Sequence, residues 1–128
     1  MCHTVDSRAP RKPLFWIGTS LEDLKSFPGV VKSMMGFGLH LAQAGGKHPD
    51  AKPLKGFTGA GVLEIIENHY GDTYRAVYTV RFAGAIYVLH AFQKKSKRGI
   101  RTPAKEIALM KDRLKRAEEH HASWRKQT

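Results

Sequence analysis

The side chains best suited to chemistry lie in one predicted β-hairpin and the segment that follows it. Arg75 lies in the first strand of this hairpin, placed at Tyr74 to Phe82, and His90 lies in the second, at Ala85 to Gln93. A guanidinium can bind a phosphate through two parallel hydrogen bonds, and an imidazole exchanges protons near neutral pH. A run of cations without an acid follows the hairpin: Lys94, Lys95, Lys97, Arg98 and Arg101. Such side chains suit a phosphate backbone, and their charge could stabilise a phosphoryl transition state without a metal.

The hairpin brings these groups to one end of a sheet. Because its strands are antiparallel, the start of the first lies beside the end of the second, which puts Arg75 near Phe92 and Lys94. Two further cations, Lys52 and Lys55, lie in a Gly-, Pro- and Lys-rich loop expected at residues 47–61. Three rings could stack on unpaired bases: Tyr74, His90 and Phe92. The competing interpretation is a solvated loop that binds nothing; Arg75 and the clustering of cations favour anion binding.

Acid–base candidates are fewer. His69 and His90 carry imidazoles that exchange protons near neutral pH, although a single histidine in an apolar strand, as at His90, is often a structural residue. Glu64 is a further candidate, in a strand expected at Val62 to Asn68, where it could equally form a salt bridge with Arg75. The sequence contains no P-loop, nucleophile elbow, dinucleotide fingerprint or histidine pair at metal-ligand spacing. We therefore expect neither a metal nor a cofactor.

An α+β domain is expected to position these residues. An apolar run at Pro13 to Gly18 predicts a strand, and two helices should follow, from Ser20 to the break at Phe27 and from Val30 to Ala44. Thr102 and Pro103 suit the start of a last helix, as N-cap and first helical residue. The predicted order is β-α-α-β-β-β-α, with a small antiparallel, partly mixed sheet. This domain should cover residues 13–118, between a flexible basic segment at 1–12 and a polar tail at 119–128.

Side-chain alternation predicts which face of the sheet carries the site. Tyr74, Ala76, Tyr78 and Val80 form the more apolar side of their strand, so we place them against the two N-terminal helices. Arg75 then points away from these helices, to a face expected to be partly open. Both sides of the strand that holds His90 are apolar, so its faces cannot be assigned. The helix at Val30 to Ala44 should bury a stripe formed by Val31, Met34, Leu41 and Ala42, with Met35 and Leu39 adjacent to it.

Composition limits the partners and the compartment. The 128 residues suit one domain, and the formal net charge of +11 favours association with polyanions such as nucleic acid, an acidic protein or an anionic membrane surface. The single cysteine, Cys2, excludes an internal disulfide and a Cys-based zinc site. The sequence has no signal-peptide pattern and no apolar run long enough to span a bilayer. A reducing cytoplasm is the expected compartment.

The order of several short segments resembles the HigB-like, phage-derived branch of the RelE/ParE toxin superfamily. The matching segments cover residues 53–56 (PLKG), 63–65 (LEI), 74–78 (YRAVY), 86–96 (IYVLHAFQKKS), 102–103 (TP) and 106–107 (EI). Residues 39–45 (LHLAQAG) also fit, so the resemblance extends over about residues 13 to 118. Relatives often carry an arginine where Ile66 stands here, and some carry a tyrosine or histidine just after the basic loop, which has no clear match.

The resemblance implies a toxin with a cognate antitoxin, often a helix-turn-helix protein. RelE-like and HigB-like members cut mRNA on the ribosome without a metal: the 2′-hydroxyl attacks the adjacent phosphate, so the protein must orient RNA and move protons. Carried onto this chain, Arg75 and Lys95 match phosphate-binding positions, with His90 and Glu64 left as acid–base candidates. Lys52, Lys55, Phe92, Lys94, Lys97, Arg98 and Arg101 would contact RNA.

Three functions compete at this point. The first is a ribosome-dependent mRNA endoribonuclease that inhibits translation, and the basic loop and His90 favour it modestly. The second is a ParE-like inhibitor that binds DNA gyrase without cutting nucleic acid. The third is a non-toxic module that binds RNA or DNA. A neighbouring gene for a helix-turn-helix protein would separate the first two from the third.

Overall fold

The computed structural model describes residues 11–57, 61–94 and 103–127. The elements follow one another as strand β1 (Leu14–Trp16), helices α2 (Ser20–Lys25) and α3 (Gly29–Gln43), strands β2 (Ala51–Pro53), β3 (Val62–His69), β4 (Asp72–Thr79) and β5 (Ile86–Lys94), and helix α4 (Ala104–Gln127). The α+β class is therefore confirmed. Strand β2 lies inside the segment predicted to be a loop, which adds one strand to the predicted order.

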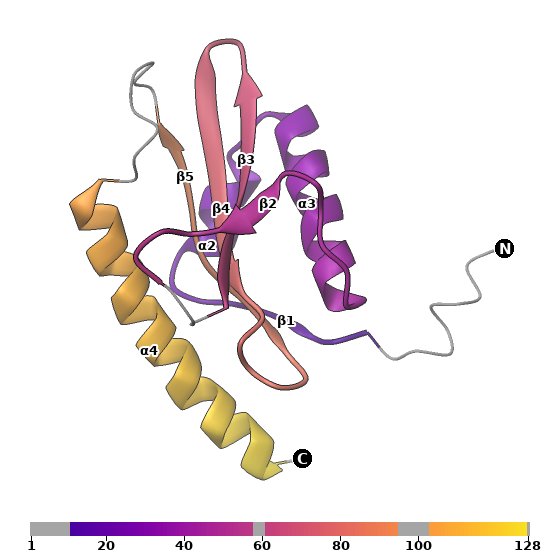
Figure 1. Cartoon of the computed structure of the whole chain (residues 1–128), viewed down its shortest axis with the longest axis vertical. Helices are drawn as coiled ribbons and strands as arrows, with labels where there is room; N and C mark the ends of the chain where they lie inside the picture. The colour runs from indigo at the N-terminus through magenta and orange to yellow at the C-terminus, as the bar shows by residue number, and fades with distance from the viewer. Residues whose placement is uncertain (1–10, 58–60, 95–102, 128) are drawn as a thin grey trace, which may run out of the picture.

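Within the described residues, one sheet contains five strands in the order β1-β5-β4-β3-β2 (Figure 1). Strand β1 is parallel to β5, and the other neighbours are antiparallel, so the sheet is mixed. Between β3 and β4, Tyr70 and Gly71 have φ of 48° and 84°, and His69 faces Asp72. Positive φ at both central residues is the geometry of a two-residue turn that matches the twist of a hairpin.

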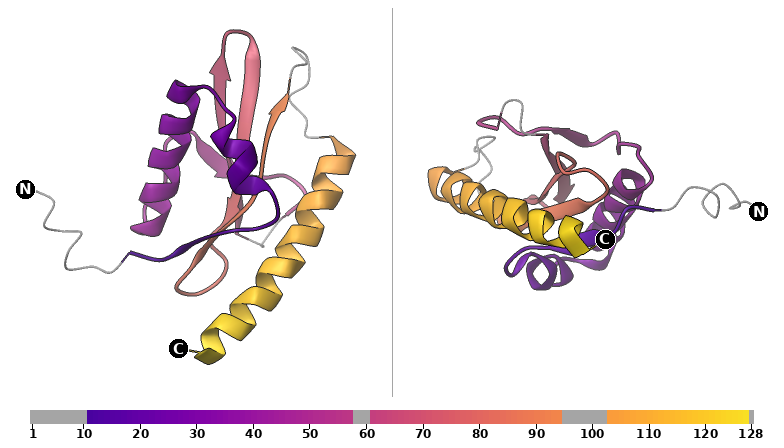
Figure 2. Two further views of the ribbon diagram at one scale, coloured as in Figure 1. Left: turned by 180° about the vertical axis from the view of Figure 1, so that it is seen from behind. Right: turned by 90° about the horizontal axis from the view of Figure 1, so that it is seen from below.

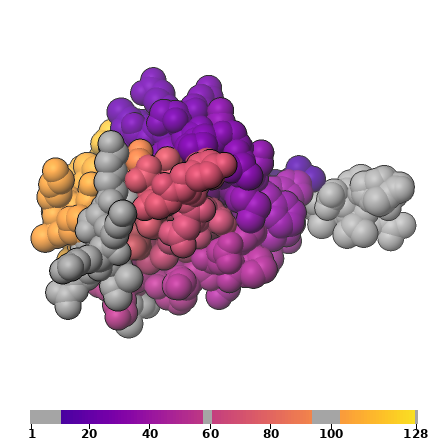
Figure 3. Space-filling model, turned by 90° about the horizontal axis from the view of Figure 1, so that it is seen from above, coloured from indigo at the N-terminus to yellow at the C-terminus, as the bar shows by residue number. Residues whose placement is uncertain are grey.

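The sheet lies between two helical layers. Helices α2 and α3 bury their apolar residues against this side of the sheet, and the prediction from side-chain alternation is confirmed for Tyr74, Ala76 and Tyr78. It is wrong for Val80, which lies beyond the end of β4 and is 39% exposed. The opposite face was expected to be partly open, and this is wrong: α4 packs there through Met110 and Ala117. Figure 2 shows α2 and α3 on one side of the strands with α4 along another, and Figure 3 looks onto the β3–β4 turn between these layers.

A β-bulge explains why the faces of β5 could not be assigned from its sequence. The β4–β5 register shifts at Val77/Tyr78, since Val77 faces His90 whereas Tyr78 faces Val88. Leu89 is the extra residue, and such an insertion changes which side chains share a face. Leu89 packs in the α4-facing cluster and the neighbouring His90 contacts α4 side chains, so consecutive residues lie on the same face.

Two helices differ from their predicted form. The buried residues of α3 are Val31, Met35, Gly38, Leu39 and Ala42. Met34 was predicted to lie in the core, and this is wrong, since it is 38% exposed. Helix α4 continues to Gln127, where a polar tail was predicted. The physical reason is aromatic packing: Trp124 meets Phe15, and His120 accepts or donates a hydrogen bond of 2.7 Å to the Tyr87 hydroxyl. No helix in the described part of the chain is long and apolar enough to cross a membrane.

Candidate functional site

The strand register brings the described candidate residues onto one face of the sheet. Lys52 faces Glu64, Glu64 faces Val77, and Val77 faces His90, which makes one row across four strands. In the next row, Arg75 lies between Ile66 and Phe92. Directly paired residues point to the same side of a sheet. Arg75, Glu64, His90 and Phe92 therefore gather on the side that α4 covers, and the predicted neighbourhood of Arg75 and Phe92 is confirmed.

Arg75 is buried, contrary to the prediction that it looks out of an open face. Arg75 is 3% exposed and Glu64 is 7% exposed. The Nη1 atom of Arg75 donates a 2.9 Å hydrogen bond to Oε1 of Glu64. Helix α4 and the residues after β2 cover this part of the sheet with apolar side chains such as Leu54 and Phe57. The Arg75–Glu64 ion pair is therefore shielded from solvent, and each charge is balanced by its partner.

His90 is held between an acid and a cation, both from α4. Its Nε2 lies 2.6 Å from Glu106 Oε1, and its Nδ1 lies 3.3 Å from Arg113 Nη1. A guanidinium can only donate, so Nδ1 accepts and Nε2 carries the proton that is shared with Glu106. The ring also stacks on Phe92, with centroids 4.7 Å apart and planes 22° apart. The imidazole is thereby fixed in one tautomer and one orientation.

Arg113 connects this cluster to the N-terminal part of the chain. Besides His90, it donates to the Leu89 carbonyl at 3.0 Å and to Thr19 Oγ1 at 3.3 Å. A Cβ at Gly18 would lie 2.9 Å from the guanidinium, so a glycine makes room for it. Burial is the largest influence on the pKa of Arg113 and lowers it. The cluster is thus a set of three ionisable side chains and one hydroxyl, that of Thr19, held by β5, α4 and the β1–α2 connection.

Glu106, Arg113 and Thr19 were not proposed as site residues from the sequence. A signal for Arg113 does exist, since it follows Met110 by three residues and precedes Ala117 by four, which puts it on the buried side of α4. A charged residue at such a position needs a partner, which the sequence does not identify. Thr19 carries no signal, because its contact depends on the fold.

The predicted RNA-binding cations are only partly described. Lys52 in β2 and Lys55 just after it are exposed, and Lys94 ends β5 opposite Thr73. Four others lie outside the described residues: Lys95, Lys97, Arg98 and Arg101. Because Lys94 ends the strand that carries His90 and Phe92, the chain enters the basic segment beside the candidate site.

Comparison with known families gives a match over residues 22–115, to the family described as phage derived protein Gp49-like. The match covers well over half of the chain. The chain belongs to the Gp49-like family. This is a family of RelE/HigB-like toxins. The matched segment contains Arg75, Glu64, His90, Glu106 and Arg113. No curated protein matches the sequence.

A second titratable cluster of the Gp49-like chain lies on the α3-facing side. His48, Asp50 and Glu67 place one potential ligand atom each within 4.8 Å of one another. Burial, a hydrogen bond with Asp50 and the charge of Asp50 raise the pKa of Glu67 from 4.5 to about 7. His48 Nδ1 already accepts a 2.9 Å hydrogen bond from the Asp50 backbone N–H. That bond occupies the His48 nitrogen closest to Asp50. A proton shared between Glu67 and Asp50 explains why their two carboxyl groups can lie close together.

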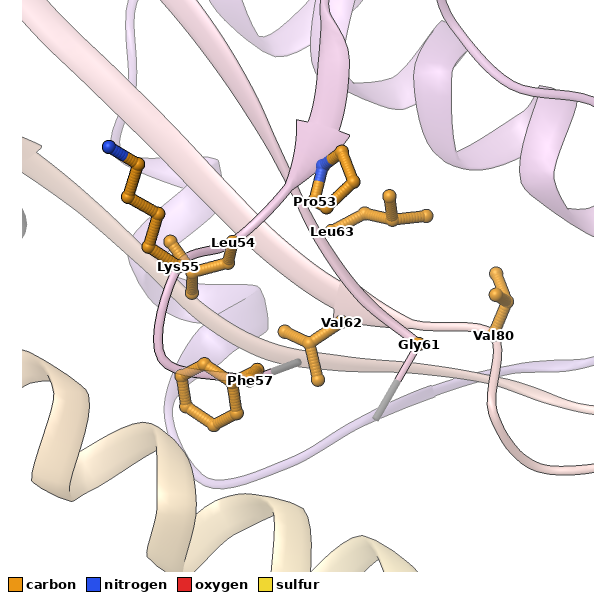
Figure 4. A pocket seen from close by; sticks show the side chains of 8 residues that line it. All are labelled: Pro53, Leu54, Lys55, Phe57, Gly61, Val62, Leu63 and Val80. Carbon is orange, nitrogen blue, oxygen red and sulfur yellow. The ribbon is translucent and has the colours of Figure 1, made fainter. Parts of the chain in front are cut away.

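A shallow apolar hollow of about 450 Å³ lies beside the start of β3. Its lining residues are Pro53, Leu54, Lys55, Phe57, Gly61, Val62, Leu63 and Val80. Figure 4 shows Val62 and Phe57 side by side, while the amine of Lys55 extends away from them. With one charged residue, which points away, this hollow offers no chemistry of its own.

Proposed function

We propose that this Gp49-like chain is the toxin of a type II toxin–antitoxin pair and that it cuts mRNA on the ribosome. Membership in a family of RelE/HigB-like toxins supports the first part. The second part rests on one observation: His90, Glu106 and Arg113 form a hydrogen-bonded cluster where β5 enters the basic segment. The net charge of +11 favours a polyanionic substrate.

The chemistry requires two proton transfers at one phosphate. The 2′-hydroxyl of the ribose loses a proton and attacks phosphorus, and the departing 5′ oxygen gains a proton. The products are a 2′,3′-cyclic phosphate and a 5′-hydroxyl end. The His90–Glu106 pair holds both an acceptor oxygen and an N–H donor, and the Glu106 side chain is its more exposed member, at 20% against 8%. Positioned acids and bases of this kind contribute about 100-fold to 10,000-fold in rate.

In this proposal most of the cations bind RNA, whereas Arg75 positions other residues. Lys94 and Lys95, with Lys97, Arg98 and Arg101, bind the backbone and offset the charge that gathers on the phosphate. Lys52 and Lys55 extend the positive surface on the β2 side, and Phe92 supports His90 by stacking. Arg75 is a positioning residue, because its guanidinium is buried against Glu64 and keeps β4 and β3 in register. Its role in binding the scissile phosphate, expected from the resemblance, requires it to leave this pair.

Induced expression with mapping of mRNA 5′ ends tests the proposal. Wild-type protein should arrest growth and produce new 5′-hydroxyl ends within translated regions. His90→Gln and Glu106→Gln should reduce cleavage by about 100-fold or more, since each removes one proton-transfer group. His69→Gln is the matched control, because it makes the same change in a strand outside the cluster, and it should remain active. Wild-type cleavage by folded His90→Gln and Glu106→Gln variants would contradict the assignment.

One observation favours a second function. Arg75 and Glu64 are 3% and 7% exposed, so two of the residues expected to carry catalysis bind each other instead of facing solvent. A toxin that acts by protein contact, as a ParE-like gyrase inhibitor does, needs no exposed catalytic group. Growth arrest without new mRNA ends, accompanied by inhibition of supercoiling by purified gyrase, would identify this function.

A further inference from the structure

The β3–β4 turn exposes an aromatic ring that the fold does not use. Tyr70 is 93% exposed, the highest value among the exposed large hydrophobic residues of the described chain. Its backbone has φ of 48°, and among residues 11–57, 61–94 and 103–127 it is the one non-glycine residue with positive φ. Bulky side chains rarely adopt this conformation, and asparagine or glycine is the usual choice in such a turn. Neither burial nor backbone preference therefore explains a tyrosine at this position.

The hairpin holds this ring on an ordered and accessible support. Pairing of β3 with β4 continues up to His69 and Asp72, which flank the turn. Tyr74, further along β4, is 6% exposed and its ring lies 4.9 Å from that of Phe27, so the hairpin is anchored to the connection between α2 and α3. Figure 1 shows the turn at one end of the molecule, beyond α3 and α4, and Figure 3 shows its surface from that end. The turn can therefore approach a large ligand without obstruction from the helices.

The ring of Tyr70 keeps most of its surface free. Its centroid lies 4.4 Å from that of His69, and the two planes are 65° apart, which is an edge contact. An edge contact covers little of a ring, in agreement with the 93% exposure of Tyr70. A planar aromatic side chain presented in this way is the group on which an unpaired nucleobase stacks.

Charge near the turn favours nucleic acid as the ligand. Lys94 ends β5 opposite Thr73, the second residue of β4, and in the sequence it begins the run of cations that reaches Arg101. The net charge of +11 attracts a polyanion. Asp72, at the turn itself, opposes a phosphate there, so the turn suits an uncharged base. Phosphates of the same strand would then meet the cations that begin at Lys94.

We propose that Tyr70 binds single-stranded RNA by stacking on one unpaired base. The choice of RNA rests on the proposed function, whereas the stacking surface is independent of it. Lys94 follows His90 by four residues of β5, a length of about 13 Å. One RNA strand would therefore contact both the His90–Glu106 cluster and the turn, and Tyr70 would hold a base some nucleotides away from the cut.

The test measures the affinity of the full-length chain for a short, fluorescently labelled single-stranded oligoadenylate over a range of salt concentrations, without ribosomes. Tyr70→Ala should weaken binding about 5-fold to 100-fold, because it removes the stacking surface for one base. The slope of log affinity against log salt should stay unchanged, because no cation is lost. Lys94→Ala should instead make this slope shallower by about 0.7. Tyr70→Phe keeps the ring and should bind within about 2-fold of the wild type.

Two controls and one stability measurement separate stacking from general effects on the fold. Phe37→Ala removes another exposed aromatic ring, 52% exposed on α3, and should not change the affinity. His69→Gln removes the edge contact but no stacking surface, so it should also bind as the wild type does. Tyr70→Asn should raise the melting temperature, since asparagine tolerates positive φ, while it weakens RNA binding as Tyr70→Ala does.

Each outcome decides the stacking proposal separately from the cleavage function. Equal affinities of the wild type and Tyr70→Ala overturn it, as does Tyr70→Phe binding as weakly as Tyr70→Ala. A changed salt slope for Tyr70→Ala, or equal weakening by Phe37→Ala or His69→Gln, overturns it as well. Unchanged RNA affinity of Tyr70→Ala with loss of a complex with the product of the adjacent gene would show that the ring contacts a protein instead. Absence of mRNA cleavage beside intact stacking counts against the proposed function alone.

Discussion

At the scale of single residues, the candidate site depends on two contacts between ionisable side chains of different elements. Arg75 binds Glu64 across β3 and β4, and His90 binds Glu106 across β5 and α4. The sequence allowed the first contact as an alternative, because a lone carboxylate in the neighbouring strand is a natural partner for an arginine. It did not allow the second, because α4 is distant in sequence and its docking face was expected to be open.

Removing one member of the Arg75–Glu64 pair should destabilise the fold. Arg75→Ala leaves the Glu64 carboxylate buried without its cation, which typically costs about 3–5 kcal/mol. Arg81→Ala is the control, because its contact with Glu118 is 3.7 Å long and solvent-exposed and should contribute about 1 kcal/mol or less. Urea unfolding measures both. Equal free energies of unfolding for the two variants would show that the buried pair contributes no more than the surface pair.

Glu67 should make stability depend on pH. Its pKa is raised to about 7 in the folded chain, from 4.5. The protonated form is therefore favoured by folding, so its stabilisation is complete below pH 4.5 and is lost as pH rises through about 7. Glu67→Gln, which mimics the protonated form, should flatten the fall in unfolding free energy between pH 5 and pH 8. Parallel stability curves for wild type and variant across this range would contradict the shared-proton interpretation.

At the scale of elements, the β4–β5 bulge and helix α3 show where periodicity fails as evidence. The bulge at Leu89 puts consecutive side chains on one face, so an alternating pattern could not assign His90. Helix α3 carries two apolar sides, and a count of apolar positions cannot tell which one meets the sheet. Met34 was consequently predicted to be buried. By contrast, Tyr74, Ala76 and Tyr78 were assigned correctly, because only one side of β4 is strongly apolar.

Two glycines of α3 should respond in opposite directions to alanine. A Cβ at Gly36 meets nothing within 4 Å, so Gly36→Ala should stabilise the chain by up to about 1 kcal/mol through helix propensity. A Cβ at Gly38 would lie 2.6 Å from Ile65 Cδ1 and 3.4 Å from His48 Cβ, so Gly38→Ala should destabilise it. Thermal unfolding of the two variants measures the difference. A rise in melting temperature for both would show that α3 can move away from β3 without cost.

At the scale of the whole molecule, the positive charge and the fold address different questions. The charge of +11 and the cations after β5 were evident from the sequence and predict a polyanionic substrate. The α+β class and the sheet order of β3, β4 and β5 also followed from hairpin logic. The long α4 did not, because its last turns are polar in sequence and are held by ring contacts of His120, His121 and Trp124. The packing of α4 covers the face of the sheet that was expected to be open, so the candidate site is partly enclosed.

Cleavage of ribosome-bound mRNA by the purified chain tests the central claim most directly. A defined mRNA is placed on initiated ribosomes, the chain is added, and 5′ ends are mapped beside a sample without ribosomes. We expect a new 5′-hydroxyl end within the ribosomal decoding site, no cut in free mRNA, and cleavage reduced at least 100-fold by His90→Gln and Glu106→Gln. Intact mRNA on ribosomes treated with folded wild-type chain, or undiminished cutting by both folded variants, would contradict this account.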